Sequence, residues 1–348
     1  MSEINLGIIG GGQLGSMLSV AAKKLNIKTT IYCNDIDAPA QNFCDEFIFG
    51  RYDDRNRILE FVKKVSLVTY EFENIPFETL NEMNKLKTVL PKPSVNRLIQ
   101  HRLAEKDFIN KLNIRTTRYA LIKKESDIET LEDFLPGILK TTTMGYDGKG
   151  QYPIKKVEDL ESLNIDFSKE YILEKFVKLK KEISVIITRF ANNNFEIYEP
   201  IENTHENQIL KYSKIPAEVN EKILTQSKEW SMRIAEELKY IGTLCVEFFI
   251  DRNDNLYVNE IAPRVHNSGH LTINAYNISQ FENHIRAVCS LKKISLKKLS
   301  NAKMVNLIGN QIKPYRENMK LKDNEFFFDY LKKEIKEKRK MGHLTTLI

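Results

Sequence analysis

The stretch Leu244-Cys-Val-Glu-Phe-Phe-Ile-Asp-Arg-Asn-Asp-Asn-Leu-Tyr-Val-Asn-Glu-Ile261 decides the fold of the second half of the chain. Two apolar runs flank a polar turn, a pattern typical of a β-hairpin. A turn centred between Asn253 and Asp254 predicts that Glu247 faces Glu260 across the two strands. Like charges opposite each other destabilise a sheet, and burying a carboxylate without a partner costs more. The pattern therefore calls for a partner between the two glutamates.

A divalent cation would remove this conflict of charge. The available ligands are carboxylate oxygens with Asn259 beside them, which suit Mg²⁺ carried by nucleotide phosphates better than zinc. The alternative is two surface glutamates, or a pair answered by lysines. The apolar neighbours favour the metal site.

Outward from this hairpin, residues 4–93 alternate short apolar runs with helical stretches, which predicts an open parallel α/β domain. A helical segment over residues 95–112 leads to a small lobe at 118–177. Long strands then surround an amphipathic helix at about 217–240. We also expect a helix over 278–291 and strands at 304–308 and 326–330.

Length and composition indicate a globular protein of 348 residues with 42% apolar and 29% charged residues. The chain has no apolar run long enough to span a bilayer, and residues 1–5 lack the basic start of a secretory signal, so we expect a cytoplasmic protein without membrane contact. The four cysteines form no CxxC pair and are interpreted as free, mostly buried thiols: Cys33, Cys44, Cys245 and Cys289.

The net charge of +6 is local rather than general. Residues 291–340 carry 15 Lys and Arg against 6 Asp and Glu. Stacking aromatics and a recognition helix are not evident there, so we expect no nucleic-acid partner. The basic run within it, residues 332–343, predicts either a pocket for a small phosphorylated ligand or a solvated helix end.

Two glycine clusters are candidates for phosphate binding. Gly10–Gly15 matches GxGxxG between a strand and a helix, which raises an NAD- or FAD-binding alternative with Asp35 or Asp37 on the ribose. The second cluster, Gly145–Gln151, follows Lys140 and lets backbone amides approach phosphate oxygens. A plain hairpin turn at its centre is the alternative reading.

The loop after the hairpin is dense in polar side chains. His266 and His270 have the spacing of a helical zinc pair, but Pro263 and Gly269 indicate a loop, and a third ligand is not evident. We interpret the segment instead as a set of anion and substrate contacts, made by Arg264, His266, Asn267 and Ser268.

These motifs, together with residues 69–75, 259–270 and 339–343, occur in an order that resembles the 5-(carboxyamino)imidazole ribonucleotide synthetases of the ATP-grasp superfamily, over about residues 4–345. The resemblance implies an α/β and α+β chain with the ATP-grasp fold, usually a homodimer. Its implied parts are an N-terminal open parallel α/β domain (1–93), a connecting helix and lid (94–180), a central antiparallel domain (181–292) and a small β-rich C-terminal domain (293–348).

The resemblance also assigns roles to residues. It implies Mg²⁺ ligands at Glu247 and Glu260. For ATP it implies Arg102, Lys140, Gly145, Tyr146, Asp147, Gly148, Lys149, Gly150, Gln151, Glu174, Lys175, Phe176, Val177, Glu182, His205, Asn259 and Glu260. For bicarbonate and the aminoimidazole it implies catalytic contacts from Tyr146, Asp147, Lys149, Arg264, His266 and Asn267. For the ribonucleotide it implies Gly12, Gln13, Leu14, Glu73, Asn74 and Ser268, with Lys332, Arg339 and Lys340 on its 5′-phosphate.

The implied reaction is ATP- and bicarbonate-dependent N-carboxylation of 5-aminoimidazole ribonucleotide through carboxyphosphate, a step of purine biosynthesis. Two departures from the family pattern stand out. Residues 141–143 are threonines where relatives are often basic, so we expect Lys149 to carry more of the phosphate charge. The chain ends at Ile348, which predicts a short final strand. Alternatives are another ATP-grasp ligase, such as a formate-dependent glycinamide ribonucleotide transformylase or a carboxylate–amine ligase, an NAD-dependent oxidoreductase, or a non-catalytic nucleotide-binding regulator.

Overall fold

The computed structural model describes residues 3–143, 150–162 and 165–348. It begins with a parallel sheet of order β3-β2-β1-β4, as the alternation of apolar and helical segments predicted. Its strands are β1 (Asn5–Ile9), β2 (Lys28–Cys33), β3 (Glu46–Phe49) and β4 (Leu67–Tyr70). Helix α1 (Gln13–Lys24) covers one face, while α2 (Arg55–Lys64) and α3 (Phe77–Leu86) cover the other.

The helical segment expected over 95–112 is two helices, α4 (Pro93–Ile99) and α5 (Arg102–Lys111). They are separated at Gln100 and His101, where the Gln100 side chain donates hydrogen bonds to the carbonyl oxygens of Glu73 and Ile75. This contact ties the break to the N-terminal domain and places the start of α5 beside the central sheet.

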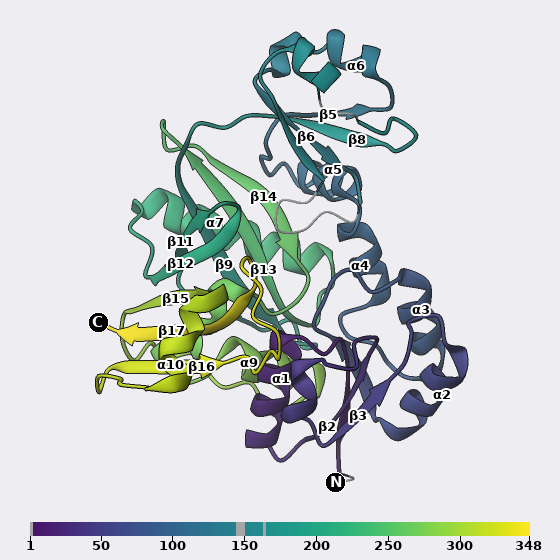
Figure 1. Ribbon diagram of the computed structural model, residues 1–348, viewed down its shortest axis with the longest axis vertical. Helices are drawn as coiled ribbons and strands as arrows, with labels where there is room; N and C mark the ends of the chain where they lie inside the picture. Colours follow the sequence, from purple (N-terminus) through teal and green to yellow (C-terminus); the bar gives the residue numbers. More distant parts are fainter. Residues whose placement is uncertain (1–2, 144–149, 163–164) are drawn as a thin grey trace.

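The small lobe is an antiparallel sheet of order β5-β8-β6-β7, seen at the top of Figure 1. Its elements are β5 (Tyr119–Ile122), α6 (Glu125–Glu129), β6 (Gly137–Thr141), β7 (Gln151–Ile154) and β8 (Tyr171–Lys175). Lys140 pairs with Gln151 across β6 and β7, so the last residue of the second glycine cluster lies beside Lys140.

A nine-stranded sheet forms the rest of the molecule, in the order β14-β13-β9-β11-β12-β15-β17-β16 with β10 on β9. The strands are β9 (Leu179–Arg189), β10 (Phe195–Ile197), β11 (Ile201–Glu206), β12 (Ile209–Ile215), β13 (Gly242–Asp251), β14 (Leu256–Ala262), β15 (Ala302–Ile308), β16 (Glu325–Asp329) and β17 (Lys340–Leu347). The sheet crosses the expected boundary at residue 293; the division into four domains stays a prediction.

Helices pack on this sheet where the sequence is amphipathic. Helix α7 (Glu221–Glu237) places Trp230 and Ile234 against Phe248 in the largest apolar cluster. Helix α9 (Gln280–Val288) packs between the large sheet and α1. The short helices α8 (Thr272–Ala275) and α10 (Lys313–Glu317) complete the α-helices among the described residues.

The hairpin β13–β14 pairs Glu247 with Glu260, which confirms the predicted facing pair. The predicted turn centre was wrong by half a residue, because Ile250 pairs with Leu256 around a turn in which Asp251 accepts the backbone N–H groups of Asn253 and Asn255. A β-bulge at Asn259 restores the register before Glu260 is reached.

The basic segment after β16 is a loop, so the alternative of a solvated helix end was wrong. Leu331 opens it with a φ of +53°, a backbone conformation that an α-helix does not contain. The loop returns the chain to β17 and places Lys332, Lys336 and Lys338 on the wall of a cavity.

Candidate active site

A cavity of about 1310 Å³ lies between the lobe, the large sheet and the N-terminal domain. Nearly all the described residues that the sequence singled out for ligand binding line it: Gly12, Gln13, Leu14, Glu73, Asn74, Arg102, Lys140, Gln151, Glu174, Lys175, Phe176, Val177, Glu182, His205, Glu247, Asn259, Glu260, Arg264, His266, Asn267, Lys332, Arg339 and Lys340. Gly150 and Ser268 are not on its wall. Gly145, Tyr146, Asp147, Gly148 and Lys149 lie outside the described residues.

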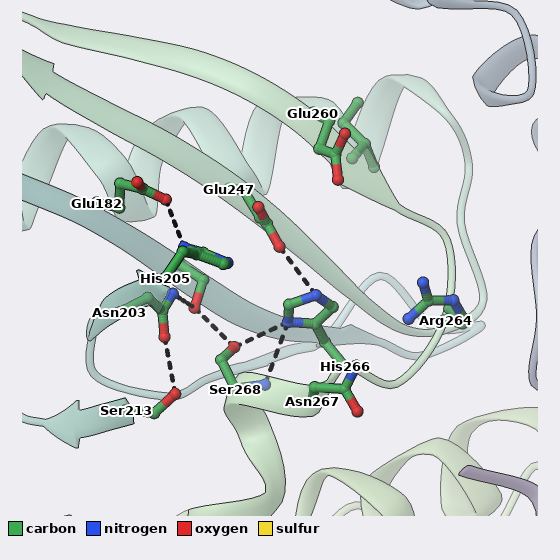
Figure 2. A network of polar contacts seen from close by, with 12 residues as sticks. Glu182, Asn203, His205, Ser213, Glu247, Glu260, Arg264, His266, Asn267 and Ser268 are labelled. Carbon is green, nitrogen blue, oxygen red and sulfur yellow. Dashed lines mark hydrogen bonds and ion pairs between the residues drawn. The ribbon is translucent and has the colours of Figure 1, made fainter. Parts of the chain in front are cut away.

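Glu247 and Glu260 face the same side of their hairpin, as Figure 2 shows. Oε1 of Glu247 lies 2.9 Å from Nε2 of His266, and Oε2 of Glu260 lies 3.5 Å from a guanidinium nitrogen of Arg102. Burial would raise the pKa of Glu247, but His266, His205 and Arg264 together outweigh burial and lower that pKa to about 2. Each glutamate of the pair therefore has a partner of its own, His266 for Glu247 and Arg102 for Glu260.

A line of buried hydrogen bonds continues behind His266 (Figure 2). The Ser268 hydroxyl lies 2.9 Å from His266 Nδ1 and 2.8 Å from the hydroxyl of Ser184. Asn203 donates to Ser184, and Ser213 donates to Asn203. Ser268 thus lies behind the histidine, fully buried, rather than on the wall where a substrate contact was expected.

This line fixes the tautomer of the imidazole. The backbone N–H of Ser268 donates to Nδ1 of His266, so Nδ1 is an acceptor. The ring proton then sits on Nε2 and is donated to Glu247. Nearby, Nδ1 of His205 lies 2.8 Å from Oε2 of Glu182, and both residues are on the cavity wall.

Arg264 and Glu73 form a two-pronged ion pair in the cavity. The Arg264 Nη2 to Glu73 Oε1 distance is 2.9 Å, and Arg264 Nε also contacts the Glu73 carboxylate. Burial would lower the pKa of Arg264 and raise that of Glu73, but their mutual attraction wins and shifts each in the opposite direction. Two groups expected to act on substrates hold each other in place here.

Lys140 and Glu174 occupy the lobe side of the cavity. Glu174 Oε1 lies 3.0 Å from Lys140 Nζ, while Glu174 Oε2 lies 3.3 Å from Nζ of Lys106 and accepts a hydrogen bond from Thr117. The Glu174 carboxylate is thus engaged by two buried lysines, and its expected place at the adenine edge stays a prediction. Lys106 could not be identified from the sequence, because a single lysine in a helical pattern does not indicate a function.

The first glycine cluster holds a carboxylate of the protein itself. Glu71 follows β4 and accepts the backbone N–H of Gly12 at 2.6 Å and of Gly15 at 2.9 Å, at the start of α1. A Cβ on Gly10 would come within 2.7 Å of the Glu71 side chain. The glycines therefore make room for Glu71 where a dinucleotide pyrophosphate would bind, which argues against the NAD or FAD reading.

The basic loop joins the same cavity. Lys332 donates to the side-chain oxygen of Gln13 at 2.8 Å, and Gln13 donates to Asn267 at 2.6 Å. Asp37, one of the two residues considered for a ribose, instead pairs with Lys333. Gln13, at the start of α1, therefore contacts the loop after β14 through Asn267 and the basic loop between β16 and β17 through Lys332.

The donors present fit a magnesium ion better than zinc. Glu247 and Glu260 offer hard carboxylate oxygens from facing strands. Among the described residues, Cys245, Glu247 and His266 also come within metal-binding distance of one another, but burial raises the pKa of the Cys245 thiol and keeps it protonated. His270 is fully buried and packs on Phe281, Tyr330 and His343, away from any shared ion with His266.

Three protein-family models match successive parts of this chain. The ribonucleotide synthetase preATP-grasp domain matches residues 2–100, the ATP-grasp domain residues 107–281, and the phosphoribosylaminoimidazole carboxylase C-terminal domain residues 302–348. The N5-carboxyaminoimidazole ribonucleotide synthase of Bacillus subtilis is 39% identical over 98% of this chain and 90% of its own length. This chain belongs to the N5-carboxyaminoimidazole ribonucleotide synthase family.

Solved structures of the family agree with the fold. The Staphylococcus aureus N5-carboxyaminoimidazole synthetase complexed with ADP has a TM-score of 0.94 and 37% identity, over 99% of this chain and 93% of that chain. The Aspergillus clavatus enzyme in complex with ADP and 5-aminoimidazole ribonucleotide has a TM-score of 0.90 and 27% identity, over 99% and 94%. The ATP-grasp fold expected from the motifs is confirmed. In the described part of this chain, no helix has the length and apolar character to cross a membrane.

Proposed function

We propose that this chain is the ATP-dependent ligase that N-carboxylates 5-aminoimidazole ribonucleotide in purine biosynthesis. One observation carries the proposal: a single cavity unites Lys140, the Glu247–Glu260 pair, Arg264 and the basic loop at Lys332 and Arg339, the groups that a nucleotide, a metal and a phosphorylated substrate need. Membership of the family supports the same reaction.

The proposed substrates are ATP, bicarbonate and the ribonucleotide. A bicarbonate oxygen attacks the γ-phosphorus of ATP, the bond to ADP breaks, and carboxyphosphate forms. The 5-amino nitrogen of the aminoimidazole then attacks the carboxyl carbon, and phosphate leaves. Catalysis of this kind depends mainly on positioning and on stabilising charge.

Different side chains of the cavity carry out the positioning of the substrates and the stabilisation of charge. Lys140 and Arg102 attract the polyphosphate. Arg264, oriented by Glu73, faces the developing carboxyl anion, and His266 keeps Glu247 oriented through its Nε2 proton. Arg339 and Lys340 bind the 5′-phosphate, while Lys332 is held toward the same end by Gln13.

The proposal also includes a metal ion and an oligomeric state. Glu247 and Glu260 would hold Mg²⁺, which when bound neutralises charge on the nucleotide phosphates. We also propose a cytoplasmic homodimer, as the family resemblance implies. Size-exclusion chromatography with light scattering at micromolar concentration checks the dimer, and a mass of 40.5 kDa at all concentrations would contradict it.

The test is ADP release with each component omitted in turn. We expect release to need Mg²⁺ and bicarbonate and to rise strongly with 5-aminoimidazole ribonucleotide. NAD(P)H should not turn over. Stimulation by glycinamide ribonucleotide with formate, and none by aminoimidazole ribonucleotide, would assign the chain to a different ligase.

A further inference from the structure

Lys106 is a buried cation that lies one step behind the cavity. It is 1% exposed, lies on α5, and is not on the cavity wall. Its Nζ is 3.3 Å from Glu174 Oε2, 3.1 Å from the Thr117 hydroxyl and 3.4 Å from the carbonyl oxygen of Asn259. A lysine is rarely buried so completely unless its charge is used.

The group as a whole has one carboxylate between two ammonium ions. Glu174 is 3% exposed and Lys140 is 6% exposed, so neither charge is screened by water. Burial would raise the pKa of Glu174, but Lys106 and then Lys140 lower it to about 2. Burial lowers the pKa of Lys140, and Lys106 and Arg102 lower it further, while Glu174 opposes them.

The two lysines differ in where they can go. Lys140 is on the cavity wall, so its ammonium group can turn from Glu174 to an anion that enters the cavity. Lys106 is enclosed by the Glu174 carboxylate, the Thr117 hydroxyl and the bulged strand at Asn259. When Lys140 turns away, Lys106 and Thr117 remain on Glu174.

We propose that Lys106 is a positioning residue that retains the charge of Glu174, so that Lys140 is released to the triphosphate of the nucleotide. Without Lys106, Lys140 would be the one cationic partner of Glu174 among the described residues. Moving Lys140 to the triphosphate would then leave the buried Glu174 carboxylate without a countercharge. Lys106 therefore controls nucleotide binding without touching the nucleotide. The inference rests on the proposed function only in taking a nucleotide phosphate as the anion at Lys140.

The experiment compares Lys106→Met with the double variant Lys106→Met/Glu174→Gln. Lys106→Met should raise the KM for ATP roughly 10- to 100-fold, the loss of one charge-assisted contact, with kcat changed less. The double variant removes the carboxylate that holds Lys140, so its KM for ATP should fall at least about threefold below that of Lys106→Met. Lys111→Met, on the exposed last turn of the same helix, is the matched control and should leave both constants unchanged.

A binding measurement separates this role from mere packing. The rise in melting temperature caused by ADP with Mg²⁺ should shrink in Lys106→Met and return in the double variant. A Lys106→Met protein that is less stable but keeps its KM for ATP would overturn the inference. A double variant no better than the single one would overturn it as well. If the wild-type enzyme does not use aminoimidazole ribonucleotide, the proposed function fails instead, and the ADP measurement still decides the role of Lys106.

Discussion

The imidazole of His266 lies between Glu247 and Ser268, and its Nε2 is 2.9 Å from the Glu247 carboxylate. This relationship ties a proposed metal ligand to a hydrogen-bond line that runs into the sheet, as Figure 2 shows. A carboxylate with one oxygen held in this way has a defined orientation before any ion arrives. Side chains that hydrogen-bond to a metal ligand commonly set the orientation of that ligand and the affinity of the site for its metal.

Replacing Ser268 with Ala should loosen His266. The change removes the hydroxyl between Nδ1 of His266 and Ser184, so we expect the free energy of unfolding to fall by about 1–3 kcal/mol. We expect kcat to fall with little change in the KM for ATP. Ser227→Ala is the control, because Ser227 is equally buried but bonds only within α7. Equal losses of activity in the two variants would remove the positioning role.

Replacing Glu260 with Gln tests the facing carboxylates. We expect most activity to be lost at limiting Mg²⁺, because one hard oxygen ligand becomes an amide. The apo protein should be as stable as wild type or more so, since a like-charge pair is relieved. Glu229→Gln, on the exposed side of α7, is the control. Wild-type activity of Glu260→Gln at limiting Mg²⁺ would refute the metal site.

Glu105 should make stability depend on pH. It is buried beside Glu260 and accepts the backbone N–H of Ile261; burial first, and then Glu260, raise its pKa from 4.5 to about 8. A raised carboxyl pKa stabilises the folded state below the unfolded value, and this contribution is lost as pH rises through about 8. Glu105→Gln should therefore flatten the loss of stability between pH 5 and pH 8, the window between those two values. Urea unfolding at a series of pH values measures it, and identical slopes would show that Glu105 is already ionised.

The basic loop should discriminate between substrates. Arg339 is half-buried at the cavity, while Lys338 is exposed although it also reaches the wall. Arg339→Ala should raise the KM for aminoimidazole ribonucleotide roughly 10- to 150-fold, the loss of a charge-assisted contact of about 1.5–3 kcal/mol. Lys338→Ala should change it much less, and neither variant should move the KM for ATP. Equal effects of both changes on both substrates would leave the loop as a basic surface.

Local patterns predicted the parallel N-terminal sheet and the facing glutamates, but not the break between α4 and α5. Strand periodicity needs only neighbouring residues, so Glu247 and Glu260 could be paired from the sequence. The bulge at Asn259 could not be predicted, because it depends on how Asp251 closes the turn. The basic loop was left open between a helix end and a phosphate site, because lysine runs occur in both.

Polar contacts between residues far apart in the chain could not be predicted from the sequence. Ser184 and Ser268 are 84 residues apart and meet because the loop after β14 returns to β9. The glycine cluster at Gly10–Gly15 has the same pattern whether a pyrophosphate or an internal carboxylate faces it. Only the position of Glu71 at the end of β4 distinguishes the two cases.

The central claim is that this cavity transfers the carbon of bicarbonate to the amino group of 5-aminoimidazole ribonucleotide at the expense of ATP. The direct measurement is ¹³C NMR of a reaction that contains ¹³C-bicarbonate, ATP, Mg²⁺ and the ribonucleotide. We predict a new carbamate carbon signal that grows in step with ADP and is absent when ATP is omitted. ADP formation without a labelled carbamate, or a labelled product that forms equally well without ATP, would contradict the account.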